Sequence, residues 1–98
     1  MFNIPKIKFS ASIWQWRGPA PFYFVTVPDE ESKEIKEISK MVTYGWGMIP
    51  VTAQIGGTKW KTSMFEKDGN YVVPIKSDVR KRENVAEGDL VILNLSVN

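Results

Sequence analysis

The chain has 98 residues, 43% of them hydrophobic and 24% charged, with 13 lysines and arginines against 11 aspartates and glutamates. It contains neither cysteine nor histidine, which excludes disulfides, the usual zinc ligands and the histidine-based catalytic triads. A chain this short supports one hydrophobic core, so we expect a single domain over residues 1–98 with no metal, no cofactor and no catalytic residue.

The first part of the chain predicts two strands. Apolar and polar residues alternate from Lys6 to Trp16, the period of a strand with one buried face. Phe22 to Val27 is rich in aromatic and β-branched residues and ends at Pro28. No secretory signal precedes these strands, and the uncharged window from Met41 to Thr58 holds too many glycines for a membrane helix. We therefore expect a cytoplasmic protein.

A helix is predicted from Glu30 to Val42. Asp29 is a good N-cap, and carboxylates in the first turn suit the positive end of the helix dipole. Gly45 can adopt the left-handed conformation that ends such helices. The residues of the apolar helix face are Ile35, Ile38, Met41 and Val42.

The middle of the chain predicts a β-hairpin. Met48 to Ile55 and Thr58 to Phe65 have strand patterns, and Gly56-Gly57 between them permits the positive backbone angles of a two-residue turn. Asp68-Gly69 marks the next turn, after which the stretch from Tyr71 to Ile75 begins another strand.

The last part of the chain predicts a short helix and a final strand. Ser77 is the expected N-cap of a helix that runs to Glu83, with Asn84 as its left-handed exit and Val85 packing back on the last turn. Leu90 to Val97 is almost continuously apolar, which predicts a central strand buried on both faces.

The two halves of the chain share a weak pattern. "FVTVPDEESKEI" compares with "YVVPIKSDVRKR", and "FSASIWQW" compares with "VTAQIGGTKW". A duplication would allow two similar halves to form one pseudo-symmetric barrel without a long free strand edge. Shared strand composition explains the likeness equally well, so both explanations stay open.

Three segments together indicate a family. "GWGMIPVTAQIGG", "WKTSMF" and "YVVPIKSDVRKRENVAEGDLVILNL" resemble, in order and spacing, the bacterial domain of unknown function family 1905, nearly from Phe9 to the end. The resemblance implies a mostly β fold: a small closed double-split barrel of about six strands with pseudo-two-fold symmetry, capped by two short helices. It implies no activity. A role in bacteriocin resistance is implied only because this domain sometimes accompanies a bacteriocin-resistance domain.

A second likeness favours DNA binding as the alternative function. "VVPIKSDVRKRENVAEGDLVIL" is similar to the swapped-hairpin unit of AbrB-type regulators, which bind DNA as dimers. This chain departs from them by carrying two half-barrels in one polypeptide and by the acidic "PDEESKEI" of its first half. In the DNA hypothesis Lys76, Arg80 and Lys81 face phosphates. In the structural alternative, which we favour, Arg80 pairs with Asp89 or Glu87.

Aromatic residues are the other candidates for binding. Flat rings can hold a base, a sugar or an apolar ligand, although such rings also fill the ends of small barrels. If Ile13 faces inward, Trp14 and Trp16 look outward side by side, which predicts a partner or ligand surface. Trp46 and Trp60 are further candidates, with Trp46 between two glycines at the expected helix exit.

Two possible catalytic or metal-binding arrangements are not favoured. Ser63 with Lys61 or Lys76 is a nucleophile pair that needs no histidine, but Ser63 lies in an alternating strand without the sharp turn of a nucleophile elbow. Glu30 and Glu31 are explained by their place at a helix start.

These patterns predict a non-catalytic binding module, present as a monomer or weak dimer. Its expected partner is a small ligand or a protein, with nucleic acid second and no membrane. The candidate binding residues are Trp14, Trp16, Trp46, Trp60, Lys76 and Arg80.

Overall fold

The structure is a computed structural model that describes residues 6–18, 21–42 and 47–97. Seven antiparallel strands form one sheet with the order β1-β7-β4-β5-β6-β3-β2. The elements are β1 (Lys6–Ser12), β2 (Trp14–Arg17), β3 (Pro21–Thr26), α1 (Asp29–Val42), β4 (Ile49–Ile55), β5 (Thr58–Lys67), β6 (Asn70–Pro74), α2 (Ser77–Glu83) and β7 (Leu90–Val97).

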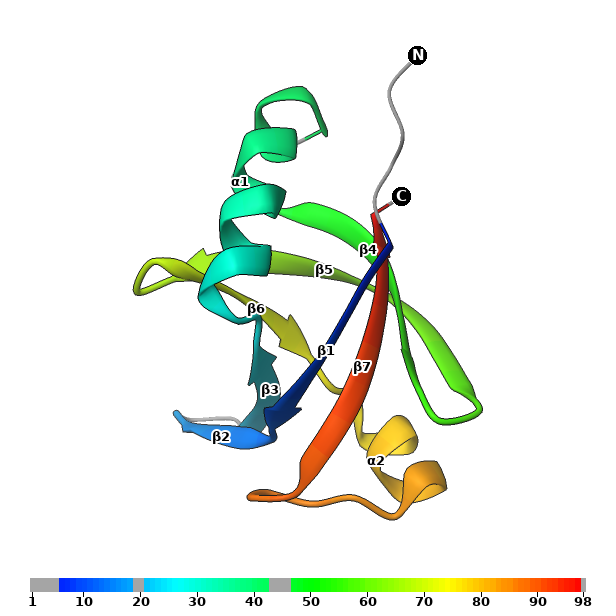
Figure 1. Ribbon diagram of the computed structural model, residues 1–98. Helices are drawn as coiled ribbons and strands as arrows, with labels where there is room; N and C mark the ends of the chain where they lie inside the picture. Colours follow the sequence, from blue (N-terminus) through cyan, green and yellow to red (C-terminus); the bar gives the residue numbers. More distant parts are fainter. Residues whose placement is uncertain (1–5, 19–20, 43–46, 98) are drawn as a thin grey trace.

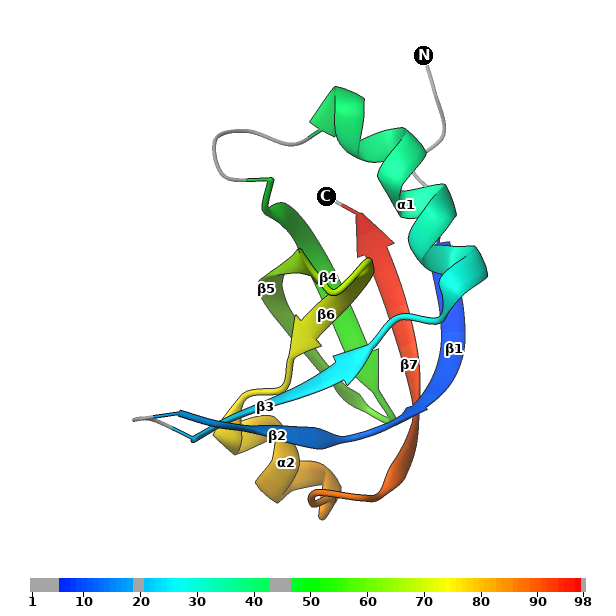
Figure 2. The ribbon, with the colours of Figure 1, turned by 90° about the vertical axis from the view of Figure 1, so that its left-hand side faces the viewer.

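The sheet curves into a half-barrel, and the two helices lie at its opposite ends (Figure 1). Figure 2 shows the same arrangement from the side, with α1 at one end and α2 beneath the β2–β3 hairpin. The predicted mostly β fold with two helices is therefore confirmed. Among the described residues, neither helix is long and apolar enough to cross a membrane.

A break at Ile13 divides the first predicted strand into two. The amide of Ile13 donates to the carbonyl of Asp89 (2.9 Å), and its own carbonyl accepts from the amide of Gly88 (2.8 Å). On one side of this break β1 pairs with β7, and on the other side β2 pairs with β3. The described part of the chain therefore has seven strands where about six were predicted. Closure into a double-split barrel stays a prediction.

The set of strand pairings is unchanged when β1 and β2 are exchanged with β5, β3 with β6, and β4 with β7. Like the first strand, β5 changes partner along its length: residues up to Met64 pair with β4, and residues from Phe65 pair with β6. Both β3 and β6 lead into a helix. This is the arrangement expected of two similar halves. It matches the comparison of "FVTVPDEESKEI" with "YVVPIKSDVRKR" but not that of "FSASIWQW" with "VTAQIGGTKW", because the latter spans β4, a turn and the start of β5.

The core lies on the concave side of the sheet. In β4 the buried residues alternate strictly with partly exposed ones, as the strand period requires. The prediction that Leu90 to Val97 is buried on both faces is wrong: β7 is central, but Leu90 is 70% exposed and Ile92 is 53% exposed. The reason is that the helices lie at the ends of the half-barrel and leave the outer face of β7 uncovered (Figure 1).

A buried serine joins the start of α1 to the sheet. The amide of Val27 donates to the carbonyl of Tyr71 (2.8 Å), as in a regular ladder. The second hydrogen bond of this pair, from the amide of Tyr71 to the carbonyl of Val27, is replaced by two bonds through the hydroxyl of Ser32. The hydroxyl donates to the carbonyl of Val27 (3.0 Å) and accepts from the amide of Tyr71 (3.1 Å). Ser32 thereby satisfies backbone groups at the point where the chain leaves the sheet.

The ends of α2 differ in part from the prediction. Ser77 is its first residue, and the N-cap is Lys76, which provides no side-chain hydrogen bond. Asn84 takes the left-handed conformation, with φ of 54° and ψ of 50°, and the amide of Val85 donates to the carbonyl of Arg80 (3.0 Å). The predicted exit is therefore confirmed, whereas the predicted serine cap is wrong.

We predict that Ser32→Ala lowers the free energy of unfolding by about 2–3 kcal/mol, because it leaves the buried amide of Tyr71 without an acceptor. The matched control is Ser39→Ala, which removes a hydroxyl of the same helix whose hydrogen bond to the carbonyl of Lys36 is exposed; it should cost less than about 1 kcal/mol. Urea denaturation measures both values. Equal losses in the two variants would contradict the role assigned to Ser32.

Candidate binding surface

Aromatic side chains from three strands meet on the outer face of the sheet. The ring of Phe24 lies 5.1 Å from Trp14 and 6.3 Å from Trp16, measured between centroids, and it meets Phe65 edge-on at 5.9 Å. Phe24 is only 5% exposed, yet it lies outside the main core cluster. These rings, with Phe22, form what we call the aromatic face.

The alternation predicted from the sequence places this face outside the core. Ile13 is 1% exposed and belongs to the core. Trp14 and Trp16 lie on the opposite face of the sheet, where their rings contact Phe24. The indole N–H of Trp14 donates to the hydroxyl of Thr26 (2.9 Å), which fixes its ring. Trp16 pairs with Phe22 across the strands and both remain accessible, at 42% and 58% exposed. The fixed rings of Trp14 and Phe24 thus lie beside the exposed rings of Trp16 and Phe22.

A pocket of about 370 Å³ adjoins the aromatic face at the end of the half-barrel that α2 covers. Phe22 belongs to both the face and the pocket, so the two surfaces are continuous. The lining includes two cationic side chains and no carboxylate, which suits a ligand with an apolar part and a negative charge. The lining residues are Phe22, Tyr23, Thr62, Pro74, Ile75, Lys76, Ser77 and Arg80.

Arg80 is the most unusual residue of the pocket. Its guanidinium carbon lies 3.6 Å from the ring centroid of Tyr23, a cation–π contact. Its Nε is buried and has no hydrogen-bond partner, and Arg80 forms no ion pair with any described residue. Stacking on the ring leaves the in-plane N–H donors of the guanidinium for another acceptor.

The predicted pairing of Arg80 with Asp89 or Glu87 is wrong. Glu87 lies 3.9 Å from Arg17, and the carboxylate of Asp89 accepts from the amide of Ala86 (2.8 Å), within its own turn. Both acids thus interact with other groups, and Arg80 stacks instead on Tyr23.

The other predicted site residues divide between the pocket and the interior. Lys76 is exposed and lines the pocket. Trp60 is 7% exposed, and its indole N–H donates to the carbonyl of Pro74 (3.1 Å), so it supports a lining residue from inside the core. Trp46 lies outside the described residues.

The described residues contain no catalytic or metal-binding arrangement of the kinds considered. They hold no group of three or more acidic, histidine or cysteine side chains placed to bind a metal ion. Ser63 and Lys61 project from one face of β5, and no hydrogen bond joins them in the described part of the chain.

Sequence reasoning missed Phe22 and Phe24 as parts of this surface. The signal was present in "FYF", where alternate rings must lie on opposite faces of one strand. The stacking of Arg80 on Tyr23 joins α2 to β3, and no local pattern indicates that these two elements meet.

We predict that Arg80→Met changes the free energy of unfolding by less than about 1 kcal/mol. The lost ring contact, about 0.5–2 kcal/mol, is offset by removal of the unsatisfied Nε, whose burial costs about 1–3 kcal/mol. The neighbouring Val79, 1% exposed, is the contrast: Val79→Ala should cost about 2 kcal/mol. Thermal and urea unfolding test both. If Arg80→Met costs as much as Val79→Ala, Arg80 is a structural residue.

Comparison with known proteins places this surface in a family context. The family model described as Domain of unknown function (DUF1905) matches residues 9–95, which include both the aromatic face and the Arg80 pocket. No curated protein matches the chain. The match covers nearly the whole sequence and agrees with the resemblance seen in its motifs, and the chain therefore belongs to the DUF1905 family.

Proposed function

We propose that this domain is a non-catalytic binding module that holds an extended segment of a partner protein. The segment lays an apolar side chain on the aromatic face beside Phe22 and places a carboxylate in the adjoining pocket against Arg80. Lys76, on the rim of the pocket, adds a second positive charge near that carboxylate.

The observation that carries the proposal is the guanidinium of Arg80, which has no ion-pair partner among the described residues and lies beside exposed aromatic rings. A partly buried cation without an anion is costly, and a native structure keeps such a group where it serves binding more than stability. Arginine forms bidentate hydrogen bonds with carboxylates, and its stacking on Tyr23 already fixes the plane of the fork. A carboxylate that enters the pocket meets a donor that needs little further ordering.

Two features favour a peptide over a small ligand. The exposed rings of Trp16 and Phe22 continue beyond the pocket and can bury a second side chain. In the described sheet β2 stands at one end of the strand order and pairs only with β3. An end strand offers backbone N–H and C=O groups to an added strand, a common mode of peptide recognition.

The proposal does not use α2 as a DNA-reading helix. α2 spans seven residues (Ser77–Glu83), and the arginine expected to face phosphates is stacked on Tyr23. The wider setting stays part of the proposal: the module is a closed double-split barrel, joined at Ile13, in a bacterial cytoplasm. The link to bacteriocin resistance comes from the family resemblance alone.

A peptide array tests this function. Each peptide carries one aromatic residue and one aspartate or glutamate at a short spacing, and a matched peptide carries asparagine or glutamine in its place. Binding is measured by tryptophan fluorescence and then by calorimetry. We expect acidic peptides to bind at least about tenfold more tightly than their amide counterparts, a difference of about 1.4 kcal/mol.

Variants locate the binding surface. Phe22→Ala and Arg80→Met should each weaken peptide binding by about tenfold or more, since both sites contact the segment. The control variant, Leu90→Ala with Ile92→Ala, removes two exposed apolar side chains of β7 and should leave affinity unchanged. The proposal is refuted if no peptide of the array binds, or if the control variant loses as much peptide affinity as Phe22→Ala and Arg80→Met.

A further inference from the structure

A second surface, on the outer face of β1, β7, β4 and β5, has a regular charge pattern. The strand register aligns two rows across the four strands: Lys8, Asn94, Gln54, Lys59 in one, and Lys6, Ser96, Thr52, Lys61 in the other. Each row has a lysine at both ends and two neutral hydrogen-bonding side chains between them. We call this surface the lysine face.

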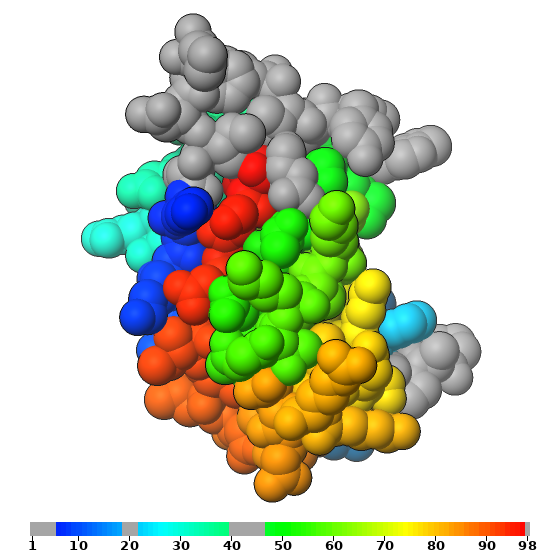
Figure 3. All heavy atoms as spheres, turned by 90° about the vertical axis from the view of Figure 1, so that its right-hand side faces the viewer, coloured from blue at the N-terminus to red at the C-terminus, as the bar shows by residue number. Residues whose placement is uncertain are grey.

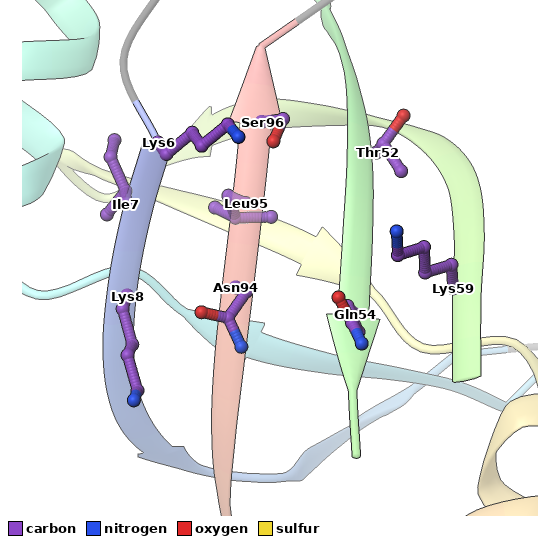
Figure 4. Close-up of a pocket in the computed structure, with 9 residues that line it drawn as sticks. All are labelled: Lys6, Ile7, Lys8, Thr52, Gln54, Lys59, Asn94, Leu95 and Ser96. Atoms are coloured by element: carbon purple, nitrogen blue, oxygen red, sulfur yellow. The ribbon is translucent and has the colours of Figure 1, made fainter. Parts of the chain in front are cut away.

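The lysine face forms a shallow hollow. A pocket of about 270 Å³ lies over the two inner strands, bounded by Lys6 and Lys8 on one side and Lys59 on the other. Figure 3 shows β1, β7, β4 and β5 side by side on this side of the molecule. In the close-up of Figure 4, the side chains of Lys6 and Lys59 lean inward over β7 and β4, whereas Lys8 runs along its own strand.

Although the carboxylate of Glu83, which accepts from Thr58, lines one pocket with Lys8, the lysines of this face have no ion-pair partner within the described chain. None of its four lysines takes part in an ion pair there, whereas Lys36 pairs with Glu66 and Lys67 with Asp68. The other outward side chains of the two rows are neutral, and the row positions include no carboxylate. The strand positions of the four lysines thus form the corners of a rectangle, from which Lys6 and Lys59 lean inward.

We propose that the lysine face binds the phosphate backbone of double-stranded nucleic acid without sequence preference. The two lysine pairs stand three strand spacings apart, about 14 Å, and within each pair the residues are about 7 Å apart along the strand. This width is close to the roughly 12 Å of the DNA major groove, so the pairs can contact phosphates on its two sides. Serine, threonine, asparagine and glutamine are the usual neutral partners of phosphate and sugar oxygens.

The composition of the face argues against a single strand. Proteins that bind single strands stack the bases on aromatic side chains, and neither row contains one. Lysine binds phosphate as a compact point charge without fixed geometry, which suits contact with a nucleic-acid backbone irrespective of its sequence. An anionic membrane is the alternative that the test must separate, because the exposed Leu90 and Ile92 line one hollow with Lys8 and Asn94.

This site is separate from the peptide surface and from α2. Its lysines come from β1 and β5, whereas the basic cluster singled out in the sequence lies on and beside α2. Loss of nucleic-acid binding and loss of peptide binding are therefore independent results.

Fluorescence anisotropy with a labelled DNA duplex of mixed sequence tests the proposal. Contact with four phosphates predicts that the logarithm of the affinity falls against the logarithm of salt concentration with a slope of about −3.6. Lys8→Gln with Lys59→Gln should weaken binding by about tenfold at about 50 mM salt and reduce the slope by about 1.8. The matched control, Lys33→Gln with Lys36→Gln, removes two lysine charges from exposed positions of α1 and should change affinity less than about twofold.

The same series contains the results that would overturn the proposal. These are no duplex binding at low salt, equal losses in the two double variants, or tighter binding of the single strand than of the duplex. Binding to vesicles of phosphatidylserine without binding to the duplex would likewise overturn it. Circular dichroism and thermal unfolding of each variant establish that the exposed substitutions leave the fold intact.

Discussion

The two backbone hydrogen bonds of Ile13 determine where the side chains of the first strand point. Because Ile13 is held by Asp89 and Gly88, the chain changes partner from β7 to β3 without losing its alternation of inward and outward residues. The outward residues before Ile13 then include Lys6 and Lys8 of the lysine face, and those after it include Trp14 and Trp16 of the aromatic face. One strand of ordinary sequence contributes to two separate surfaces.

The same construction recurs in β5. Lys59 and Lys61 lie on the lysine face, and beyond Met64 the strand turns to pair with β6, where Phe65 joins the aromatic face. The exchange symmetry of the strand pairings explains why each surface takes side chains from β5 and from the first stretch of chain, which contributes β1 to the lysine face and β2 to the aromatic face. Since the core residues all lie on the concave side, each outer surface can change its side chains without altering the packing of the interior.

Features set by neighbouring residues could be predicted from the sequence. The two helices, the turn at Gly56-Gly57 and the left-handed exit at Asn84 follow from local propensity and backbone freedom, and the alternation around Ile13 correctly placed the two tryptophans on the outer face. These are properties of short stretches, which need no knowledge of the partner strand.

Features that depend on distant partners could not be predicted. The rows of the lysine face require the register of β1 with β7 and of β7 with β4, which a pattern along one strand does not contain. The bridging role of Ser32 and the stacking of Arg80 on Tyr23 also join elements far apart in the sequence. The exposure of Leu90 and Ile92 shows that an apolar run in a central strand can still have one uncovered face.

Residue-resolved amide hydrogen exchange tests the role of the Ile13 bend most directly. If the two hydrogen bonds at the Ile13 break persist in the native state, the amides of Ile13 and Gly88 exchange only through global unfolding. Their exchange then has the same free energy as that of the amides of Ala53 and Leu93 in the central strands. Exchange of Ile13 and Gly88 at the rate of an unprotected peptide, while the central strands stay protected, would show that these hydrogen bonds are open and that the two faces are not held in place by them.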